Sequence, residues 1–227
     1  MKRIVFKNVS NMRDLGGYLT KDKKVTKYLR FIRSDAPVEL EKEEIDFLLE
    51  NNITTIIDFR KDYEVEKNKC MLNTKGFNYY NISLEGSEIP KTEDDIPRGY
   101  MNMINHKNSM SKIFTVMASA KSNILFHCMA GKDRTGVVAM ILLLLANAYE
   151  EDIIADYEVS NTYLKNKIKK MHEDNPALPS FLGSSKSKHM EEALQLFKEE
   201  YGSVNKYMEF LGIDLDMVNT IKSKLID

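Results

Sequence analysis

Short apolar segments alternate with amphipathic stretches along the first part of the chain. Residues 53–59 form a short segment rich in β-branched residues, as expected of a buried strand, and they follow residues 40–51, whose apolar positions recur with helical period. Two further strands are predicted at residues 78–83 and 123–126. The pattern therefore predicts strands joined by helices, which is typical of an α/β fold with a central, mostly parallel sheet flanked by helices.

From residue 109 onwards the pattern is mostly helical, so the carboxyl-terminal half is predicted to be rich in helices. Residues 174–187 interrupt the pattern with Pro176, Pro179, Gly183 and several serines, and we expect this segment to be a mobile flap. The predicted helices are residues 112–120, 135–146, 153–170, 188–201, 204–211 and 215–225.

Length and composition are those of an ordinary globular protein. The 227 residues, 43% hydrophobic and 30% charged, are enough for one core, and we expect a single domain over residues 1–227. The longest apolar run, residues 137–146, is about half of the roughly 20 residues that a bilayer-spanning helix needs. It predicts a buried helix and no stable membrane insertion.

The overall charge is close to zero. Lys and Arg number 33 against 34 Asp and Glu, so the net charge of −1 offers no general attraction to nucleic acid, and any anion site must be local. Cys70 and Cys128 are the only cysteines and show neither disulfide nor zinc spacing. No apolar stretch typical of a signal peptide is present at the N-terminus, and we expect a cytoplasmic location.

The strongest chemical signal lies between the predicted strand 123–126 and the helix after it. Cys128 is followed by five residues, then by Arg134 at the start of the helix. Backbone N–H groups at a helix N-terminus are unpaired donors, and the helix dipole adds partial positive charge there. The loop Cys128–Arg134, called the phosphate loop below, is therefore predicted to bind a phosphate group.

The same field stabilises a negatively charged sulfur, and we expect Cys128 to be a thiolate at neutral pH. Arg134 offers a planar fork of donors that matches the equatorial oxygens of a phosphoryl group during transfer. Attack by the thiolate on phosphorus would give a phosphocysteine intermediate and divide hydrolysis into two displacements. Neither step requires a metal ion or another cofactor, and we expect none.

Residues 127–136, His-Cys-Met-Ala-Gly-Lys-Asp-Arg-Thr-Gly, resemble the signature of cysteine-dependent tyrosine and dual-specificity phosphatases. Four other segments, at residues 11–18, 33–35, 57–60 and 156–157, resemble landmarks of the bacterial atypical phosphatases that carry Gly-Lys-Asp-Arg-Thr in this loop. The resemblance implies the cysteine-phosphatase fold. It also implies a phosphorylated substrate: phosphotyrosine in proteins, sometimes phosphoserine or phosphothreonine, and often phosphoinositides.

The resemblance also assigns roles within the loop. It makes Asp133 the general acid that protonates the leaving oxygen, although Asp94 and Asp95 lie in a polar stretch where other relatives carry this acid. Lys132 is expected to add charge beside the phosphate, and the resemblance associates it with a wide substrate range. The residues expected to bind phosphate are Met129, Ala130, Gly131, Lys132, Asp133 and Arg134.

Several residues are expected to support the loop. By resemblance His127 orients it through hydrogen bonds, and Thr135 donates its hydroxyl to the sulfur. Since buried charges need partners, we expect four charged residues near apolar segments to brace it: Arg13, Asp14, Asp58 and Arg60. The remaining histidines, His106, His172 and His189, show no metal-ligand spacing and are expected at the surface.

Two further interpretations remain open for Cys70. Its neighbours in sequence are polar, which favours a free structural cysteine over a redox partner of Cys128.

Three alternatives to a broad-specificity protein-tyrosine phosphatase remain at this point. A phosphoinositide phosphatase would need extra basic residues at the mouth of the site, for which Lys132, Lys165 and Lys186 are candidates. A second alternative is a non-catalytic module that recognises phosphate groups, against which the joint presence of Cys128, Asp133 and Arg134 argues. A more distant one is a sulfur or arsenate enzyme with a cysteine loop. The oligomeric state cannot be inferred from the sequence.

Overall fold

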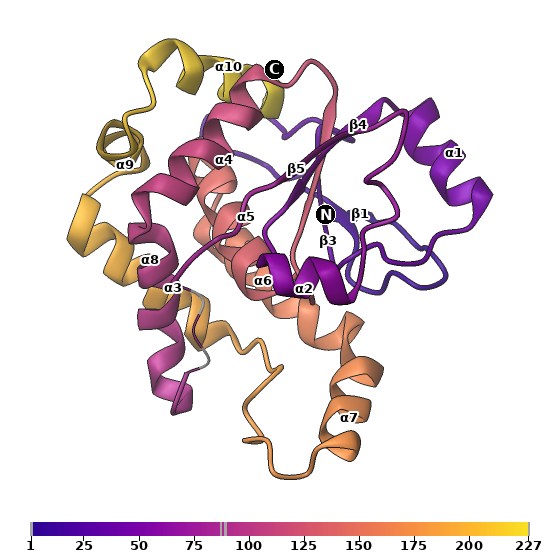
Figure 1. The fold of residues 1–227 in the computed structure, drawn as a ribbon. Helices are drawn as coiled ribbons and strands as arrows, with labels where there is room; N and C mark the ends of the chain where they lie inside the picture. Colours follow the sequence, from indigo (N-terminus) through magenta and orange to yellow (C-terminus); the bar gives the residue numbers. More distant parts are fainter. Residues whose placement is uncertain (1, 87, 89, 227) are drawn as a thin grey trace.

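A six-stranded mixed sheet forms the centre of the molecule (Figure 1). The computed structural model describes residues 2–86, 88 and 90–226. The strands are β1 (Lys2–Arg3), β2 (Arg13–Asp14), β3 (Phe31–Ser34), β4 (Ile53–Asp58), β5 (Asn78–Asn81) and β6 (Asn123–His127), in the spatial order β1-β2-β3-β6-β4-β5. From β3 to β5 all neighbours are parallel, and β1 and β2 add an antiparallel edge. The predicted fold class is confirmed.

The register of the parallel strands brings three chain segments to one edge of the sheet. His127 at the end of β6 pairs with Ser34 at the end of β3 and with Asp58 at the end of β4. Whatever follows these three residues must therefore meet at the carboxyl edge, which is where open α/β sheets bind their ligands. The phosphate loop follows directly after His127.

Helices cover both faces of the sheet. They are α1 (Lys42–Glu50), α2 (Asp62–Lys67), α3 (Ile96–Asn105), α4 (Lys107–Ser119), α5 (Asp133–Leu145), α6 (Glu150–Tyr163), α7 (Lys165–Asp174), α8 (Ser187–Tyr201), α9 (Val204–Leu211) and α10 (Leu215–Leu225), with a short 3₁₀ turn, η1 (Glu93–Asp95), before α3. Figure 1 shows α1 on one side of the sheet and α5 with most of the other helices on the opposite side.

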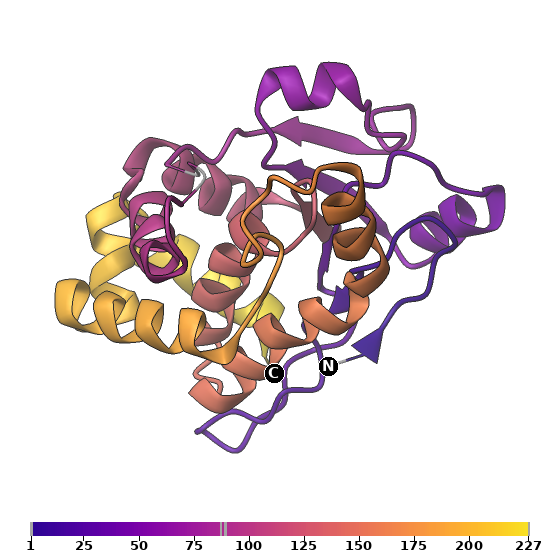
Figure 2. The ribbon, with the colours of Figure 1, turned by 90° about the horizontal axis from the view of Figure 1, so that it is seen from below.

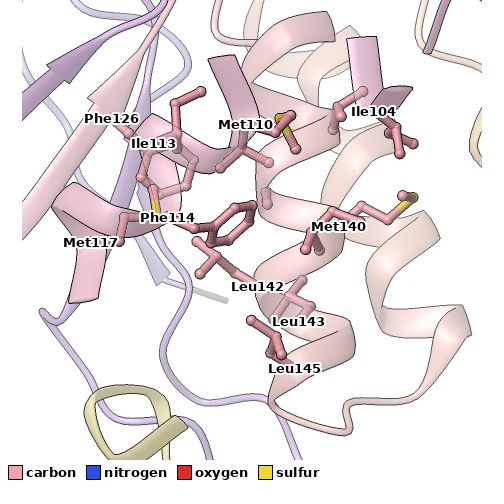
Figure 3. Packing of buried hydrophobic residues seen from close by; sticks show 14 of the residues in the cluster. Ile104, Met110, Ile113, Phe114, Met117, Phe126, Met140, Leu142, Leu143 and Leu145 are labelled. Carbon is pink, nitrogen blue, oxygen red and sulfur yellow. The ribbon is translucent and has the colours of Figure 1, made fainter. Parts of the chain in front are cut away.

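Alternate residues of the central strands face two separate cores. Ile56 and Leu125 belong to the smaller cluster on the α1 side, whereas Ile57 and Phe126 belong to the larger cluster on the α5 side. Helix α5 is buried over most of its length, and Figure 3 shows its apolar side chains against those of α4 and against Phe126. This packing fixes the N-terminus of α5, and with it the phosphate loop.

Several element boundaries differ from the predictions. The helix predicted over 153–170 is two helices, α6 and α7, which meet at Leu164. No Gly or Pro marks this break; Leu164 is buried whereas most of α7 is exposed, and the pattern alone could not separate them. Helix α3 was not predicted, although Pro97 stands in its first turn, a favourable position for proline. The strands β1, β2 and β3 were not predicted either.

The segment 174–187 is observed as a series of turns between α7 and α8. Figure 2, which views the molecule from below, shows α7 and this segment crossing in front of the end of the sheet. Its mobility, like the assignment of residues 1–227 to one domain, stays a prediction. In the part of the chain that the structure describes, helices long and apolar enough to cross a bilayer are absent.

The large core predicts a stability effect. Leu142 on α5 is fully buried (Figure 3), so Leu142→Ala should lower the free energy of unfolding by about 2–5 kcal/mol in denaturant titrations. Leu215→Ala is the matched control, because Leu215 is 71% exposed, and it should change that free energy by no more than about 0.5 kcal/mol. Equal effects of the two variants would contradict the described packing.

Candidate functional site

The phosphate loop connects β6 to α5 at the carboxyl edge of the sheet. Gly131 adopts a φ of +65°, and a Cβ atom there would come within 2.3 Å of the Ser34 carbonyl oxygen. Only glycine fits this position, because the loop turns directly against the end of β3. The backbone N–H of Ala36, just after β3, donates to the carbonyl of Met129 over 3.1 Å.

Two side chains from distant segments hold the loop through its carbonyl oxygens. Asn11 Nδ2 donates to the carbonyls of Ala130 (2.9 Å) and Gly131 (3.1 Å). Arg33 on β3 donates to the Gly131 carbonyl over 2.8 Å and lies 3.4 Å from that of Lys132. With these carbonyls turned outward, the N–H groups are left for the inner side of the loop. Within the described residues, no hydrogen bond uses the backbone N–H groups of residues 129–132 as donors.

Arg33 is itself held by a buried charge cluster. The carboxylate of Asp156 on α6 accepts a hydrogen bond from Arg33 and another, of 2.9 Å, from Arg13 Nε. Burial by itself would raise the pKa of Asp156, but Arg13 and Arg33 outweigh it and lower this pKa to about 2. Arg13 also donates to the backbone carbonyl and the side chain of Asn11. The cluster therefore orients both residues that grip the loop.

The predicted braces have different roles in the structure. Arg13 supports the loop through Asn11, as just described. Asp14 does not contact the loop: its carboxylate accepts from the backbone N–H groups of Gly16 and Leu29 and so holds the β2–β3 connection. The expectation that Asp14 braces the loop is wrong, because these local N–H groups satisfy its oxygens.

Asp58 and Arg60 lie beneath His127. Arg60 donates to Asp58 over 2.6–3.1 Å, and Tyr79 donates to the same carboxylate over 2.7 Å. His127 is fully buried, with Nε2 3.6 Å from Asp58 and 3.7 Å from the sulfur of Cys70, and its Nδ1 lies 3.2 Å from the Cys128 carbonyl. Burial lowers the pKa of His127 and Asp58 opposes the shift.

Cys70 is buried, between the smaller apolar core and the charged side chains beside His127. It is 5% exposed and belongs to the smaller apolar core, and burial raises the pKa of its thiol to about 11. Its sulfur and ligand atoms of Asp58 and His127 lie within 4.8 Å of one another. Since Arg60 and Tyr79 already donate to Asp58, this carboxylate has its charge balanced by a guanidinium.

Cys128, the first residue of the loop, is 2% exposed. Thr135 in the first turn of α5 is also buried, but its hydroxyl oxygen has no hydrogen-bond partner among the described residues. The expected hydrogen bond from Thr135 to the sulfur is therefore not formed. Thr135 lies in the first turn of α5.

Arg134 is held in a fixed orientation by a residue that the sequence did not indicate. Glu64 on α2 accepts two hydrogen bonds from the Arg134 guanidinium, of 2.6 and 2.8 Å. Burial alone would lower the pKa of Arg134, but the bonds to Glu64 and the nearby Cys128 raise it above its ordinary value. The bidentate pair fixes the plane of the guanidinium at the edge of the site before any ligand binds.

Asp133 and Lys132 form a second polar group at the mouth of the loop. Lys132 is 5% exposed and donates to Asp133 Oδ1 (2.9 Å) and to the carbonyl of Ser184 (2.8 Å). Tyr100 on α3 donates to the same oxygen of Asp133 over 2.6 Å. Burial favours a raised pKa for Asp133, but the Lys132 charge and the two hydrogen bonds lower it.

The alternative acids lie elsewhere. Asp94 is 90% exposed and lies 3.5 Å from Lys188. Asp95 accepts hydrogen bonds from the backbone and hydroxyl of Thr92. Neither lines a cavity at the phosphate loop, whereas Asp133 does.

Two cavities open on the loop, on either side of Gly183. The first, of about 180 Å³, is lined by Lys132, Asp133 and Arg134 together with Tyr100 and Phe181. The second, of about 300 Å³, also reaches Lys132 but is mostly apolar, and is lined by Ala36, Val38, Asn68, Met129, Ala130, Leu164, Lys167, Ile168, Met171 and Gly183. The segment 174–187 thus forms part of the walls of the site.

The lysines proposed for the mouth are placed less favourably for a polyanion. Lys186 lies 2.7 Å from Glu93. Lys167, which was not among the predicted residues but lines the second cavity, lies 2.8 Å from Asp35. Lys165 is exposed and lines neither cavity. Of the three candidates, only Lys132 reaches the loop.

The surface prediction for the histidines is wrong for one of them. His189 on α8 is 1% exposed and contacts Glu93 and Tyr157. His106 and His172 are partly exposed. The helical pattern of α8 placed His189 among polar residues, so its burial against another helix left no signal in the sequence.

Sequence reasoning also gave no role to several residues that shape the site. Asn11, Arg33 and Asp156 lie within the landmark segments, which was the available signal. Glu64 and Tyr100 had none, because only the folded chain brings α2 and α3 to the loop.

Known proteins resemble this chain along most of its length. The model of the tyrosine phosphatase family matches residues 4–227. A tyrosine-protein phosphatase of Nostoc commune is 26% identical over 217 aligned residues, covering 86% of this chain and 74% of that protein. The triple specificity protein phosphatase PtpB of Mycobacterium tuberculosis is 28% identical over 137 residues, covering 53% of this chain and 49% of that protein.

Among solved structures, Pseudomonas aeruginosa TpbA in complex with pTyr aligns with a TM-score of 0.41 and 12% identity, covering 84% of this chain and 91% of that one.

The charge cluster predicts a stability effect that depends on pH. Asp156→Asn leaves Arg13 and Arg33 buried without their carboxylate and should lower the free energy of unfolding by about 3–5 kcal/mol at pH 7. Because the folded pKa of Asp156 is depressed to about 2, its stabilisation is complete above the unfolded pKa of roughly 4 and is lost as the pH falls through about 2.

Denaturant titrations should therefore show that the difference in free energy of unfolding between wild type and Asp156→Asn decreases by roughly 2 kcal/mol from pH 5 to pH 2. Asp216→Asn, at an exposed carboxylate, is the control and should change the free energy of unfolding by no more than about 0.5 kcal/mol. A gap that stays constant with pH would contradict the described cluster.

Proposed function

The chain belongs to the tyrosine phosphatase family, as the resemblance of its loop predicted, and we propose that it hydrolyses phosphomonoesters through a phosphocysteine on Cys128. The observation that carries the proposal is the loop itself. Its cysteine is buried at the start of a turn in which the backbone N–H groups of residues 129–132 donate to no other described residue. The turn ends at Arg134, which Glu64 already orients. A phosphoryl group bound there meets donors on one side and the sulfur on the other.

In the first displacement the thiolate of Cys128 attacks phosphorus, and the bond to the leaving oxygen breaks. Arg134 and the loop N–H groups hold the three equatorial oxygens as charge develops on them. Asp133 gives its proton to the leaving oxygen. In the second displacement Asp133 takes a proton from water as the water oxygen attacks phosphorus, and Cys128 leaves as thiolate. Apart from the attacking water, every group that acts on the substrate in this scheme belongs to the protein.

Asp133 must be protonated for the first step, although Lys132 and Tyr100 hold its pKa low in the free protein. A phosphate dianion in the loop raises the pKa of Asp133 again, because a nearby negative charge favours the neutral acid and competes for the Lys132 ammonium. Substrate binding therefore prepares the acid. The position of Asp133 on the wall of the first cavity supports its role over that of Asp94 and Asp95.

The walls of the site favour phosphotyrosine as the main substrate, with a broad preference that extends to phosphoserine and phosphothreonine. Met129, Ile168, Met171 and Phe181 give the cavities apolar surfaces that suit an aromatic ring. A phosphoinositide headgroup would need several free cations, whereas Lys167 and Lys186 are paired with carboxylates. The relative named for triple specificity supports a broad range, over the half of its length that this chain covers.

Phosphate release in excess EDTA tests the thiolate mechanism. Wild type should turn over, and Cys128→Ser should lose at least about a thousandfold in kcat, because the nucleophile is removed. Cys70→Ala, which removes the other thiol, should retain EDTA-resistant turnover. The panel should contain phosphotyrosine, phosphoserine and phosphoinositide substrates, with phosphotyrosine the best. Turnover that EDTA abolishes, or that survives Cys128→Ser, would contradict the proposal; a phosphoinositide preference would replace the substrate class.

The role of Asp133 is tested by varying the leaving group. Asp133→Asn should lower kcat/KM, which reports the first displacement alone, on phenyl phosphate by roughly 10²–10⁴-fold, since phenol needs a proton as it leaves. The same variant should lose much less on difluoromethylumbelliferyl phosphate, whose leaving group is a far stronger acid. Asp94→Asn and Asp95→Asn are the controls and should show no such dependence. If Asp94→Asn or Asp95→Asn showed the leaving-group dependence and Asp133→Asn did not, the residue changed in that control would be the general acid.

A further inference from the structure

A chain of hydrogen-bonded side chains runs from Asp133 in the phosphate loop to Glu93 near the surface. The hydroxyl of Tyr100 lies 2.6 Å from Asp133 Oδ1 and 2.6 Å from the hydroxyl of Tyr157 on α6. The Tyr157 hydroxyl lies 3.4 Å from Nδ1 of His189 on α8, and Nε2 of His189 lies 3.0 Å from Oε1 of Glu93. These side chains come from separate elements, so the folded structure alone brings them into line.

The middle of the chain is closed to solvent. Tyr100, Tyr157 and His189 are each no more than 2% exposed. Burial raises the pKa of both tyrosines, so each keeps its single proton at neutral pH. Each phenol can therefore donate one hydrogen bond along the chain and must accept the other.

Counting donors and acceptors shows which proton arrangements satisfy every contact. If Asp133 is ionised, Tyr100 donates to it, Tyr157 donates to Tyr100, and Nδ1 of His189 must donate to Tyr157. The carboxylate of Glu93 also requires an N–H, on Nε2. His189 is then doubly protonated.

The reverse arrangement satisfies every contact as well. If Asp133 is protonated, it donates to Tyr100, Tyr100 donates to Tyr157, and Tyr157 donates to Nδ1 of a neutral His189, which keeps its proton on Nε2 for Glu93. The two arrangements hold the same number of protons. With one proton fewer, two acceptors must face each other at one contact, which is unfavourable in a buried chain.

We propose that Tyr100, Tyr157 and His189 are positioning residues that keep one proton in reserve for Asp133, the acid of the proposed function on which this inference rests. When Asp133 needs its proton, His189 releases one from Nδ1 to the Tyr157 oxygen. The hydroxyl proton of Tyr157 passes to Tyr100, and that of Tyr100 passes to Asp133. Asp133 then protonates the leaving oxygen, and the proton it takes from water in the second displacement restores the original number.

The charges around both ends determine the direction of the pH effect. Burial lowers the pKa of His189, Glu93 opposes this shift, and Lys132 and Lys188 add to it. Lys186 contacts the same Glu93 carboxylate.

At the other end Lys132, Tyr100 and Arg134 favour ionised Asp133. The two ends share one apparent pKa, which belongs to the whole chain. Activity on substrates that need the acid falls as the pH rises through this value. Without His189, Asp133 alone must hold the proton, so activity is lost at a lower pH than in the wild type.

The test is the pH dependence of kcat/KM, which reports the first displacement, on phenyl phosphate and on difluoromethylumbelliferyl phosphate. His189→Asn keeps a polar group near Nδ1 but cannot take up a proton, and Tyr157→Phe breaks the chain while leaving the contact between Tyr100 and Asp133. Each variant should move the alkaline limb on phenyl phosphate down by at least about half a pH unit. Neither should change the profile on the umbelliferyl substrate. The double variant should shift the limb no further than either single one, because one chain is broken in each case.

His106→Asn is the matched control, since His106 contacts Ser109 and lies outside the chain; its profile should equal that of wild type. Thermal melting of each variant checks that it is folded. Unchanged alkaline limbs, equal losses on both substrates, or additive shifts would overturn the inference. If Asp133→Asn shows the leaving-group dependence while His189→Asn and Tyr157→Phe do not shift the limb, the inference fails and the proposed function stands. If Asp133→Asn shows no such dependence, the proposed acid itself fails.

Discussion

The pairing of Asp156 with two buried arginines is the interaction on which the site depends. Three charged groups with almost no exposure are stable only together, since removing one partner leaves an uncompensated buried charge. The pairing joins α6 to β2 and β3, and both arginines lead to the loop: Arg33 binds its carbonyls directly, and Arg13 orients Asn11, which does the same. Loop shape and fold stability therefore have a common origin.

Around this cluster the protein gathers paired arginines and carboxylates, although its net charge is close to zero. The net charge is −1, yet the loop is bordered by Arg134 with Glu64 and, beneath His127, by Arg60 with Asp58. Each cation is oriented by a carboxylate, so little reorganisation is needed when a phosphoryl group arrives. The result is a local anion site in a chain of nearly zero net charge. Such a site suits a single phosphoryl group on a substrate and does not suit a large polyanionic ligand.

The sequence predicted those parts of the site that are local in the chain. Periodicity predicted the α/β fold and the strand that ends at the cysteine. The residues from Cys128 to Arg134 predicted the phosphate loop. Contacts between distant segments were not predictable: Glu64 reaches Arg134 from α2, and Tyr100 reaches Asp133 from α3. The same reason explains the errors at Asp14 and His189. Whether a polar side chain braces the loop, caps a turn or is buried depends on what packs against it, and periodicity does not record that.

The covalent intermediate is the central claim, and trapping it is the most direct measurement. Asp133→Asn should slow the attack of water on the phosphocysteine. During turnover of an aryl phosphate with an acidic leaving group, this variant should therefore accumulate phosphoenzyme, which an acid quench preserves. Mass spectrometry of the digested protein should then find one phosphoryl group on Cys128 and none on Cys70. A phosphoryl group on any other residue, or turnover without a phosphoenzyme whenever the quench is made, would contradict the account.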